Sequence, residues 1–530
     1  RDDVTWAAGW VTEEDRGLLL GQGRYPARFA ALDAPGINAF GLVTGLKQVT
    51  VTKQADKLID SEQTAALKAR GAEGRALLHD VDVYVKGINA RLRAEKSPQK
   101  PWTRVDVYSI NALAGQIFGQ GGGDEVRRSQ LLDALRTRLG KSKANTIFND
   151  LSEHIDADTP VTINKTFPYE QVPNTQAGNA VIKNGSTSPK TAKAVANSAT
   201  SRRYASNFLM VGAKRSATGH PLFVAGPQIG YFYPGLTLEM DLKGPGFQAR
   251  GAAIPGGAGN ILIGRGEDFA WSLTSAGSDT NDQFVETLCG GSDTKYLYKG
   301  KCQKMGTVNA GKIAGAGGGP VVFHTTVHGP VQGYAKSGGK RVAISFMRSS
   351  HGKDVLWQLI FRRMTIGQVS GLNSFYSAAA TSPFTFNVAY ADDKNIAAYS
   401  AGRLPIRDKR VDPRLPTKGT GQFEWKGFLK PLAHPHQANP ASGKLVNWNN
   451  KPAQGFGSSD SEWAYGSIHR VQMLNAGIDA RPTHDLASVV SAMNKAATQD
   501  LRDAGSLLDA ITAVLDTGPA PSPRAAQMEA

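Results

Sequence analysis

The sequence predicts an α+β protein, because its two halves carry different hydrophobic periods and a polar segment separates them. Over residues 1–165 of the 530-residue chain, apolar residues recur at spacings of three and four, as on one face of a helix. From residue 206 onward the spacing becomes two, and Gly and Pro residues mark turns between short strands. Both a two-domain arrangement and one layered body built from the two halves fit this order of elements.

Helices are predicted in the first half from three apolar faces, and the last 50 residues return to a helical pattern. The three faces are Leu78, Val81, Val85, Ile88 and Leu92; Val107, Ile110, Leu113 and Ile117; and Leu131, Leu132, Leu135 and Leu139. Each set steps by three and four along the chain, apart from the adjacent pair in the third, so its members share one side of a helix. The segment 1–175 is therefore predicted to be mainly helical.

Residues 176–205 differ in composition from both halves. The run "QAGNAVIKNGSTSPKTAKAVANSATSRRYA" is rich in Ser, Thr, Ala, Asn and Gly and contains five basic residues but no acidic one. A segment with so little apolar surface is predicted to remain unstructured and open to cleavage. We therefore divide the chain into 1–175, a cleavable spacer at 176–205, and 206–530.

Strands are predicted in the third part from alternating residues. In "LTLEMDLKG", Leu236, Leu238, Met240 and Leu242 fall on one face, and "FNVAYADDKNIAAYSAG" indicates two strands around a polar turn. Segments 207–213 and 222–226 form a predicted hairpin centred near Ala217. This centre would place Ser206 opposite Gln228.

Composition limits the classes of function. Lys and Arg exceed Asp and Glu by 16, which most simply indicates a solvated basic surface; an acidic substrate or an anionic cell surface is the alternative. No nucleic-acid-binding motif accompanies the charge, so nucleic-acid binding is not predicted. No apolar run is long enough for a membrane span. The chain opens at "RDDVTWAAGW" without Met, so we expect that an N-terminal segment has been removed.

The two cysteines, Cys289 and Cys302, flank the polar loop of "CGGSDTKYLYKGKC". They predict a hairpin closed by a disulfide, which would stabilise the fold by roughly 3 kcal/mol in the chain-entropy model. A closed pair with no odd cysteine favours an extracytoplasmic, periplasmic or secreted location. Two buried free thiols are the alternative.

Ser206 stands at the start of a predicted strand, directly after the cleavable spacer, with no histidine beside it. A serine hydroxyl is a weak nucleophile unless a base takes its proton. Cleavage between Ala205 and Ser206 would free the serine α-amine, whose ordinary pKa of about 7.7–8.0 suits a general base. One residue would then supply both nucleophile and base. A structural serine at a strand start is the alternative.

An ordered set of motifs resembles the penicillin acylase family of N-terminal-nucleophile hydrolases. The set comprises Ser206–Asn207, "GPQ", "AWSLTSAGSDTNDQF", "DPRLPTKGTG", "NWNNKP" and "HR". The resemblance implies a four-layer αββα sandwich of two packed antiparallel sheets, and a heterodimer of two fragments cut from one precursor. It also implies hydrolysis of the side-chain amide of penicillins or related N-acyl compounds through an acyl-enzyme.

The resemblance assigns roles to single residues. Ser206 corresponds to the nucleophile, and cleavage would be intramolecular, after Ala205. Gln228 corresponds to the residue that positions the amine, and Arg470 to the arginine that orients the catalytic asparagine. Asn449 corresponds to that asparagine, an oxyanion donor. The second donor is the backbone N–H of Ser275, with Ala276 as the alternative.

The same resemblance implies a structural Ca²⁺ site and an apolar acyl pocket. The six oxygen ligands suit a hard cation and would come from Asp279, Asn281, Asp282, Pro413, Asp460 and Glu125. Scattered surface carboxylates are the alternative. The pocket would be lined by Ile229, Ile263, Leu273 and Phe118.

Aliphatic residues stand in this pocket where some family members carry phenylalanine, so a broader acyl preference fits as well as phenylacetyl. Gln228 resembles the penicillin acylase branch rather than the branch with His. An acylase for lipopeptides or acyl-homoserine lactones, and an inactive basic secreted binding protein, are the alternatives. Compared with the family, we expect the chain to lack elements at both ends.

Overall fold

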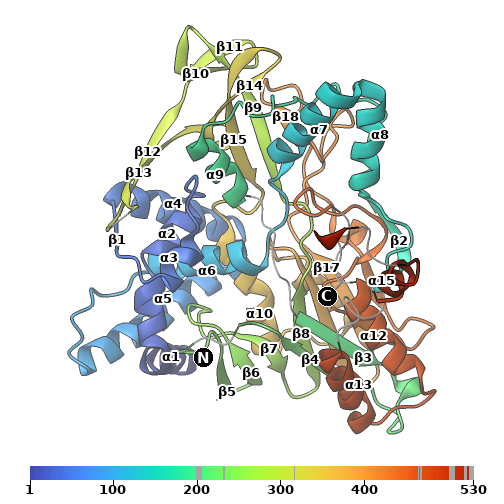
Figure 1. Cartoon of the computed structure of the whole chain (residues 1–530). Helices are drawn as coiled ribbons and strands as arrows, with labels where there is room; N and C mark the ends of the chain where they lie inside the picture. The colour runs from blue at the N-terminus through green and yellow to red at the C-terminus, as the bar shows by residue number, and fades with distance from the viewer. Residues whose placement is uncertain are drawn as a thin grey trace.

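The computed structural model (Figure 1) describes residues 1–198, 206–230, 233–315, 317–463, 465, 468–499, 508–518 and 522–524. The helices before residue 206 are α1 (Asp2–Gly23), α2 (Pro26–Ala31), α3 (Ala39–Thr44), α4 (Lys53–Ala69), α5 (Gly71–Ala94), α6 (Arg104–Phe118), α7 (Glu125–Leu139), α8 (Lys141–Leu151) and α9 (Pro189–Ser198). Those after it are α10 (Gln358–Thr365), α11 (Leu372–Ala379), α12 (Ile468–Asp479), α13 (Leu486–Thr498) and α15 (Leu508–Leu515).

The strands form four sheets. A seven-stranded sheet has the order β19 (His436–Ala438), β17 (Ile396–Ala401), β16 (Phe386–Asp392), β8 (Phe269–Ser275), β7 (Ile261–Arg265), β6 (Phe247–Ala253) and β5 (Leu238–Gly244). A three-stranded sheet has the order β20 (Lys444–Asn447), β3 (Ser206–Val211) and β4 (Leu222–Pro227). All pairs in these two sheets are antiparallel.

The nine-stranded sheet extends away from these two. Its order is β1 (Val49–Val51), β12 (Gly306–Ile313), β13 (Gly319–Thr326), β14 (Gly329–Ser337), β15 (Lys340–Arg348), β9 (Asn281–Cys289), β10 (Ser292–Tyr298) and β11 (Lys301–Lys304), with β18 (Thr417–Lys418) beside β9. A short parallel pair joins β2 (Ile163–Tyr169) to β21 (Ala453–Phe456).

Alternation along β3 builds the layers. Phe208 and Met210 pack in one cluster with Ala389 and Ala398 of the seven-stranded sheet. Leu209 and Val211 point to the other side and pack with residues of α12 and α13, which cover β3 and β4 in Figure 1. The far face of the seven-stranded sheet packs on α10 and α11. The αββα sandwich implied by the resemblance is confirmed.

The helical half and the strand half share one core. A single cluster of buried residues joins α1, α4, α5 and α6 to β5–β8 and β16. The two halves therefore form one layered body rather than two separate domains. On α5, Val81, Val85, Ile88 and Leu92 are buried as predicted. The third predicted face is only partly buried, because Leu139 at the end of α7 is exposed. Among the described residues, every helix is too short or too polar to cross a bilayer.

The prediction of an unstructured spacer is wrong for residues 176–198. Asn179 and Ile182 form β-bridges with Thr417 and Ser337, and α9 packs against β14. Ile182 and Val195 are buried in a cluster with strands β9, β14 and β15. The few apolar residues of this segment are therefore enough to order it against the sheet. Residues 199–205, Ala205 included, lie outside the described residues.

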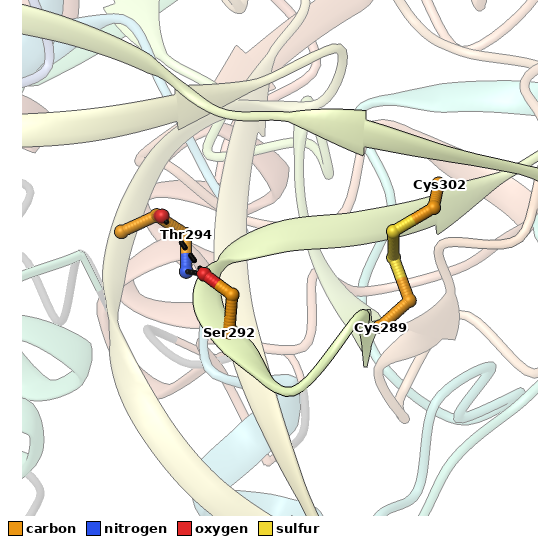
Figure 2. Close-up of a disulfide and its surroundings, with 4 residues drawn as sticks. All are labelled: Cys289, Ser292, Thr294 and Cys302. Atoms are coloured by element: carbon orange, nitrogen blue, oxygen red, sulfur yellow. Dashed lines mark hydrogen bonds between the residues drawn. A yellow bond between two sulfur atoms is a disulfide. The ribbon is translucent and has the colours of Figure 1, made fainter.

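The predicted disulfide between Cys289 and Cys302 is present, with the two Cα atoms 6.0 Å apart. Figure 2 shows that it ties the end of β9 to β11, while Ser292 and Thr294 lie at the start of β10. The intervening residues are not a plain loop, since β10 pairs with both neighbours. The bond therefore closes a three-stranded tip rather than a single hairpin.

Candidate active site

Ser206 is the first residue of β3, the central strand of the three-stranded sheet, and is half-buried. Its partner across the ladder is Pro227. The predicted pairing with Gln228 is therefore wrong by one residue. The connection between β3 and β4 contains a 3₁₀ turn, Ala213–Arg215, which moves the centre of the hairpin.

Asn449 joins Ser206 to strand β8. Its side-chain Oδ1 accepts a hydrogen bond of 3.1 Å from the backbone N of Ser206. Its Nδ2 donates to the carbonyl of Ser275 at 2.9 Å. An amide nitrogen has two N–H donors, so the second is left for another acceptor. The structure thus brings together three of the predicted residues through one neutral amide.

The turn that carries Asn449 is held by other asparagines of "NWNN". Asn449 has a left-handed φ of 62°, a conformation that asparagine tolerates better than most residues. Its backbone N donates to Asn447 Oδ1 at 2.9 Å, and the backbone N of Trp448 donates to Asn450 Oδ1 at 2.9 Å. Sequence reasoning assigned no role to Asn447 and Asn450, although their repetition around Asn449 was the available signal.

Gln228 and Arg470 both contact Trp448. The indole Nε1 donates to Gln228 Oε1 at 2.8 Å, and the Arg470 guanidinium lies 5.4 Å from the Trp448 ring centroid. Trp448 is buried and was missed by sequence reasoning. Gln228 and Arg470 are thereby linked to Asn449 through the residue that precedes it.

The backbone of β8 favours Ser275 over Ala276 as a donor toward the serine. The N–H of Ala276 donates to the carbonyl of Thr385 at 3.2 Å, so it is used in the ladder with β16. Backbone groups point alternately to the two sides of a strand. The N–H of Ser275 therefore points away from β16, to the side on which its carbonyl contacts Asn449.

An apolar cavity of about 70 Å³ opens beside Ser206. All four predicted pocket residues line it together with Ser206 and Ser275: Phe118, Ile229, Ile263 and Leu273. Trp357 and Phe386 complete its aromatic wall. A second apolar cavity of about 100 Å³ lies between α1, α3 and α6. The two cavities share Phe118, Leu236 and Ile254 in their walls.

Three of the oxygens predicted to bind a metal converge on Gly122. A Cβ atom at Gly122 would lie 2.2 Å from Asp279 Oδ1, 2.6 Å from the Asn281 carbonyl and 3.0 Å from Asp460 Oδ1. Only a glycine leaves room for all three at this point. Both carboxylate oxygens of Asp279 are buried without a hydrogen bond.

The remaining predicted ligands are less directly placed. Glu125 is buried, with Oε1 accepting from the backbone N of Gln283 at 3.0 Å and Oε2 without a partner. Asp282 accepts from Trp425 Nε1 at 2.7 Å. Pro413 is buried in the loop before β18.

Sequence reasoning missed two further residues beside these carboxylates, Arg407 and Glu170. The Arg407 guanidinium lies 3.1 Å from Asp279 and 2.5 Å from Asp282, and it also contacts Glu170. Glu170 is almost fully buried. No local motif marks either residue, because they come from segments far apart in the sequence.

Burial dominates the electrostatics of the acidic cluster, which we define as Glu125, Glu170, Asp279, Asp282 and Asp460. Desolvation, aided by the charge of Asp460, raises the pKa of Asp279 well above its usual range, and burial raises that of Asp282 to about 8. Within the described part of the chain, no three carboxylates surround one point as a closed metal site; Arg407 lies among them. The oxygen donors around Gly122 nevertheless have the chemistry that a hard divalent cation requires.

The fold and this centre define a class of protein: an αββα sandwich in which a strand-initiating serine bonds to an asparagine amide at the mouth of an apolar cavity. The chain belongs to the penicillin amidase family, which matches residues 1–527.

Individual relatives agree with this assignment. The chain is 26% identical over 442 residues to penicillin G acylase of Escherichia coli, covering 76% of this chain and 51% of the relative. It is 25% identical over 532 residues to acyl-homoserine lactone acylase QuiP of Pseudomonas aeruginosa, covering 92% and 57%. The solved structure of a thermostable penicillin G acylase from Alcaligenes faecalis matches with a TM-score of 0.52 at 27% identity, covering 60% of this chain and 57% of that one. The chain spans about half the length of the curated relatives it matches.

Proposed function

We propose that this chain carries the active centre of an acylase that hydrolyses N-acyl amides through an acyl-enzyme on Ser206. The observation that carries the proposal is the hydrogen bond of 3.1 Å between the Ser206 backbone N and Asn449 Oδ1, at the mouth of an apolar cavity. The family relationship supports it, because named relatives are acylases of penicillins and of acyl-homoserine lactones.

Maturation would begin with the peptide bond between Ala205 and Ser206. The Ser206 hydroxyl attacks the Ala205 carbonyl, and the acyl group moves from nitrogen to oxygen. One water molecule then cleaves the ester, which frees the Ala205 carboxylate and the Ser206 amine. Asn449 Oδ1, already bonded to this nitrogen, would hold the new amine beside the hydroxyl.

Hydrolysis of a substrate would use the same groups. The freed amine accepts the hydroxyl proton while Oγ attacks the amide carbonyl. The second N–H of Asn449 Nδ2 and the backbone N–H of Ser275 stabilise the oxyanion. Removing one such donor typically lowers the rate by a factor of about 10²–10³. The proton passes to the leaving amine, and water resolves the acyl-enzyme.

The residues that line the two cavities indicate which acyl group the enzyme would prefer. The apolar residues beside Ser206 favour an aromatic or aliphatic acyl group without charge. The second apolar cavity behind Phe118 favours an acylase for longer aliphatic chains as the alternative, because displacement of this one ring would join the two spaces. A panel of N-acyl amides with rising acyl length separates the two preferences.

Replacement of Phe118 sharpens this comparison. Phe118→Ala should move the optimum toward longer acyl chains, whereas Phe167→Ala, a phenylalanine of β2 outside both cavities, should not. An optimum that stays at short acyl groups in Phe118→Ala would exclude the longer-chain function.

Calcium would be structural in this proposal. Asp279, Asp460, Glu125 and the Asn281 carbonyl would hold the ion, and its charge would offset the buried carboxylates of the acidic cluster. The predicted disulfide and the family relationship fit an extracytoplasmic enzyme. We also propose that two fragments from one precursor form the protomer.

Intact-mass analysis under denaturing conditions tests the central step. An active preparation should give two fragments that meet at Ser206, and Ser206→Ala should give one uncut chain without activity. Ser292→Ala, at the disulfide-closed tip shown in Figure 2, is the control and should be cut normally. Turnover by an uncut chain would refute the proposed base, and an inactive binding protein would show cleavage without sulfonylation of Ser206 by a serine-directed sulfonyl fluoride.

A further inference from the structure

A cavity of about 750 Å³ lies apart from the serine centre. It opens between α4 and the strands β12–β15, and the segments around His351, Arg403 and Phe428 close it. Among the described residues, it shares no wall residue with the apolar cavity beside Ser206. The mechanism proposed above uses none of its side chains.

Most charges in this cavity are already paired. Arg348 lies between Asp33, at 2.7 Å, and Asp354. His351 contacts the other oxygen of Asp33 at 2.7 Å and Glu62 at 3.4 Å. The carboxylates of the wall are therefore occupied by these two cations.

His328 is paired in the same way. Its two ring nitrogens lie 2.8 Å from Glu286 and 3.0 Å from Glu424. The carboxylates beside this histidine are thus also engaged, and none of them is directed at the remaining cations of the cavity.

Lys353 and Arg403 are left without a carboxylate among the described residues. Lys353 Nζ donates only to the His351 carbonyl, at 3.2 Å. Arg403 Nε is buried without a hydrogen-bond partner, and its guanidinium lies 3.5 Å from the Phe428 ring centroid. Burial lowers the pKa of Lys353, and the charge of Arg403 lowers it further, against the opposite effect of Asp354 and Glu62. Two partly desolvated like charges that line one cavity are costly unless an anion offsets them.

Four aromatic residues also belong to the wall. Phe323, Phe346, Trp425 and Phe428 line the cavity near these cations. The space is much larger than an inorganic anion needs, and aromatic faces favour a flat apolar body. Lys57, an exposed residue of α4, adds a further positive charge at the wall.

We propose that this cavity binds a small organic carboxylate with an aromatic ring, held by its carboxylate between Lys353 and Arg403 and by its ring against Phe346 and Phe428. Arg403 offers a planar fork of donors that matches a carboxylate, and none of the described carboxylates forms an ion pair with it. The site is separate from Ser206 and does not depend on the proposed hydrolysis.

Calorimetric titration with 2-naphthoate tests the site on the full chain, without any turnover. The neutral 2-naphthylmethanol should bind at least tenfold more weakly, and inorganic phosphate should also bind at least tenfold more weakly because it lacks the ring. Equal affinity for the neutral alcohol would overturn the role of the cations. Equal affinity for phosphate would overturn the role of the ring.

Variants locate the binding. Lys353→Met combined with Arg403→Gln should weaken 2-naphthoate at least tenfold, whereas Lys47→Met, an exposed lysine in the wall of another cavity, should leave it unchanged. Lys353→Met alone, which gives up one hydrogen bond, should give a smaller loss and serves if the double variant does not fold. Unchanged affinity in Lys353→Met and in a folded double variant would place all binding elsewhere, such as the Ser206 cavity, and overturn the proposal.

Discussion

The serine centre and the acidic cluster are both buried and both polar, but they are satisfied in different ways. Around Ser206 the hydrogen-bonding groups are neutral. Asn449 accepts one hydrogen bond from the serine nitrogen and donates one to the Ser275 carbonyl. In the acidic cluster Arg407 contacts three of the five carboxylates, and both oxygens of Asp279 lack a hydrogen bond.

This difference assigns catalysis to the serine centre and stability to the acidic cluster. Neutral donors keep their direction at every working pH and can be preorganised for an oxyanion. Buried carboxylates without enough positive charge are unfavourable unless protons or a cation neutralise them. We therefore expect the first region to control the rate and the second to control the stability, and each prediction below tests that division.

The largest expected effect follows from Asn449→Ala. The variant loses the amide that holds the Ser206 nitrogen and donates to the oxyanion, so kcat should fall by a factor of about 10²–10³. The melting temperature should change far less. Steady-state kinetics on an N-acyl amide, with thermal unfolding on the same sample, measures both.

Asn439→Ala is the matched control, because Asn439 also has a left-handed φ, of 44°, but lies in an exposed turn. It imposes the same kind of backbone strain without touching the serine centre. Equal losses of kcat in the two variants would mean that strain, and not the lost amide, explains the effect.

Removal of calcium should give the next largest effect, on stability. An ion present at 100–1,000 times its dissociation constant stabilises the fold by about 3–4 kcal/mol. A chelator should therefore lower the melting temperature, and Asp279→Asn should abolish most of that response because it removes a charge that faces Gly122. Thermal unfolding with and without Ca²⁺ is the measurement.

Asp293→Asn serves as the control for the chelator, since this exposed carboxylate pairs with Arg341 outside the cluster. It should keep the full response to calcium. A protein whose melting temperature is the same with chelator and with excess Ca²⁺ would contradict the proposed ion.

The sequence predicted best what depends on local pattern or on motif order. The alternation of Leu238, Met240 and Leu242 in β5 is borne out by their burial, because strand period is a local property. Motif order placed Ile229 and Leu273 correctly in one cavity with Ser206.

What the sequence could not predict depends on turns and on distant contacts. The 3₁₀ turn after β3 shifted the pairing of Ser206 from Gln228 to Pro227, and a turn's conformation is not readable from its length. Arg407 and Glu170 are in contact although they lie far apart in the sequence, and no spacing rule connects them. Part of the predicted spacer is ordered because Ile182 packs on a cluster of strand residues.

His328 is a buried group that, unlike the carboxylates of the acidic cluster, has an oppositely charged partner at each ring nitrogen. Hydrogen bonds and charges from Glu286 and Glu424 overcome burial and raise the pKa of His328 to about 9. The folded state therefore holds this proton more tightly than the unfolded state, so the stabilisation is complete below about pH 6.5 and is lost as pH rises through about 9. Unfolding free energies over this range should fall by at most about 3 kcal/mol.

His328→Gln should reduce this slope, whereas His79→Gln should retain it in full, because His79 is exposed and pairs with Asp2 at the surface. The same slope in wild type and His328→Gln would assign the pH dependence to other groups. The hydrolytic rate is not expected to follow this titration, since His328 lies outside the serine centre.

The smallest effects come from a matched pair of tryptophans, one in each region. Trp448→Phe removes the hydrogen bond of 2.8 Å that the indole N–H donates to the neutral Gln228 Oε1. Trp425→Phe removes the hydrogen bond of 2.7 Å that the other indole donates to the Asp282 carboxylate. A neutral hydrogen bond contributes about 0.5–1.5 kcal/mol and one to a charged group about 1.5–3 kcal/mol. Above about pH 8, where the Asp282 carboxylate is ionised, Trp425→Phe should therefore lower the unfolding free energy more, while only Trp448→Phe should lower kcat. If Trp425→Phe slows hydrolysis as much as Trp448→Phe, the two regions are coupled and the division between rate and stability fails.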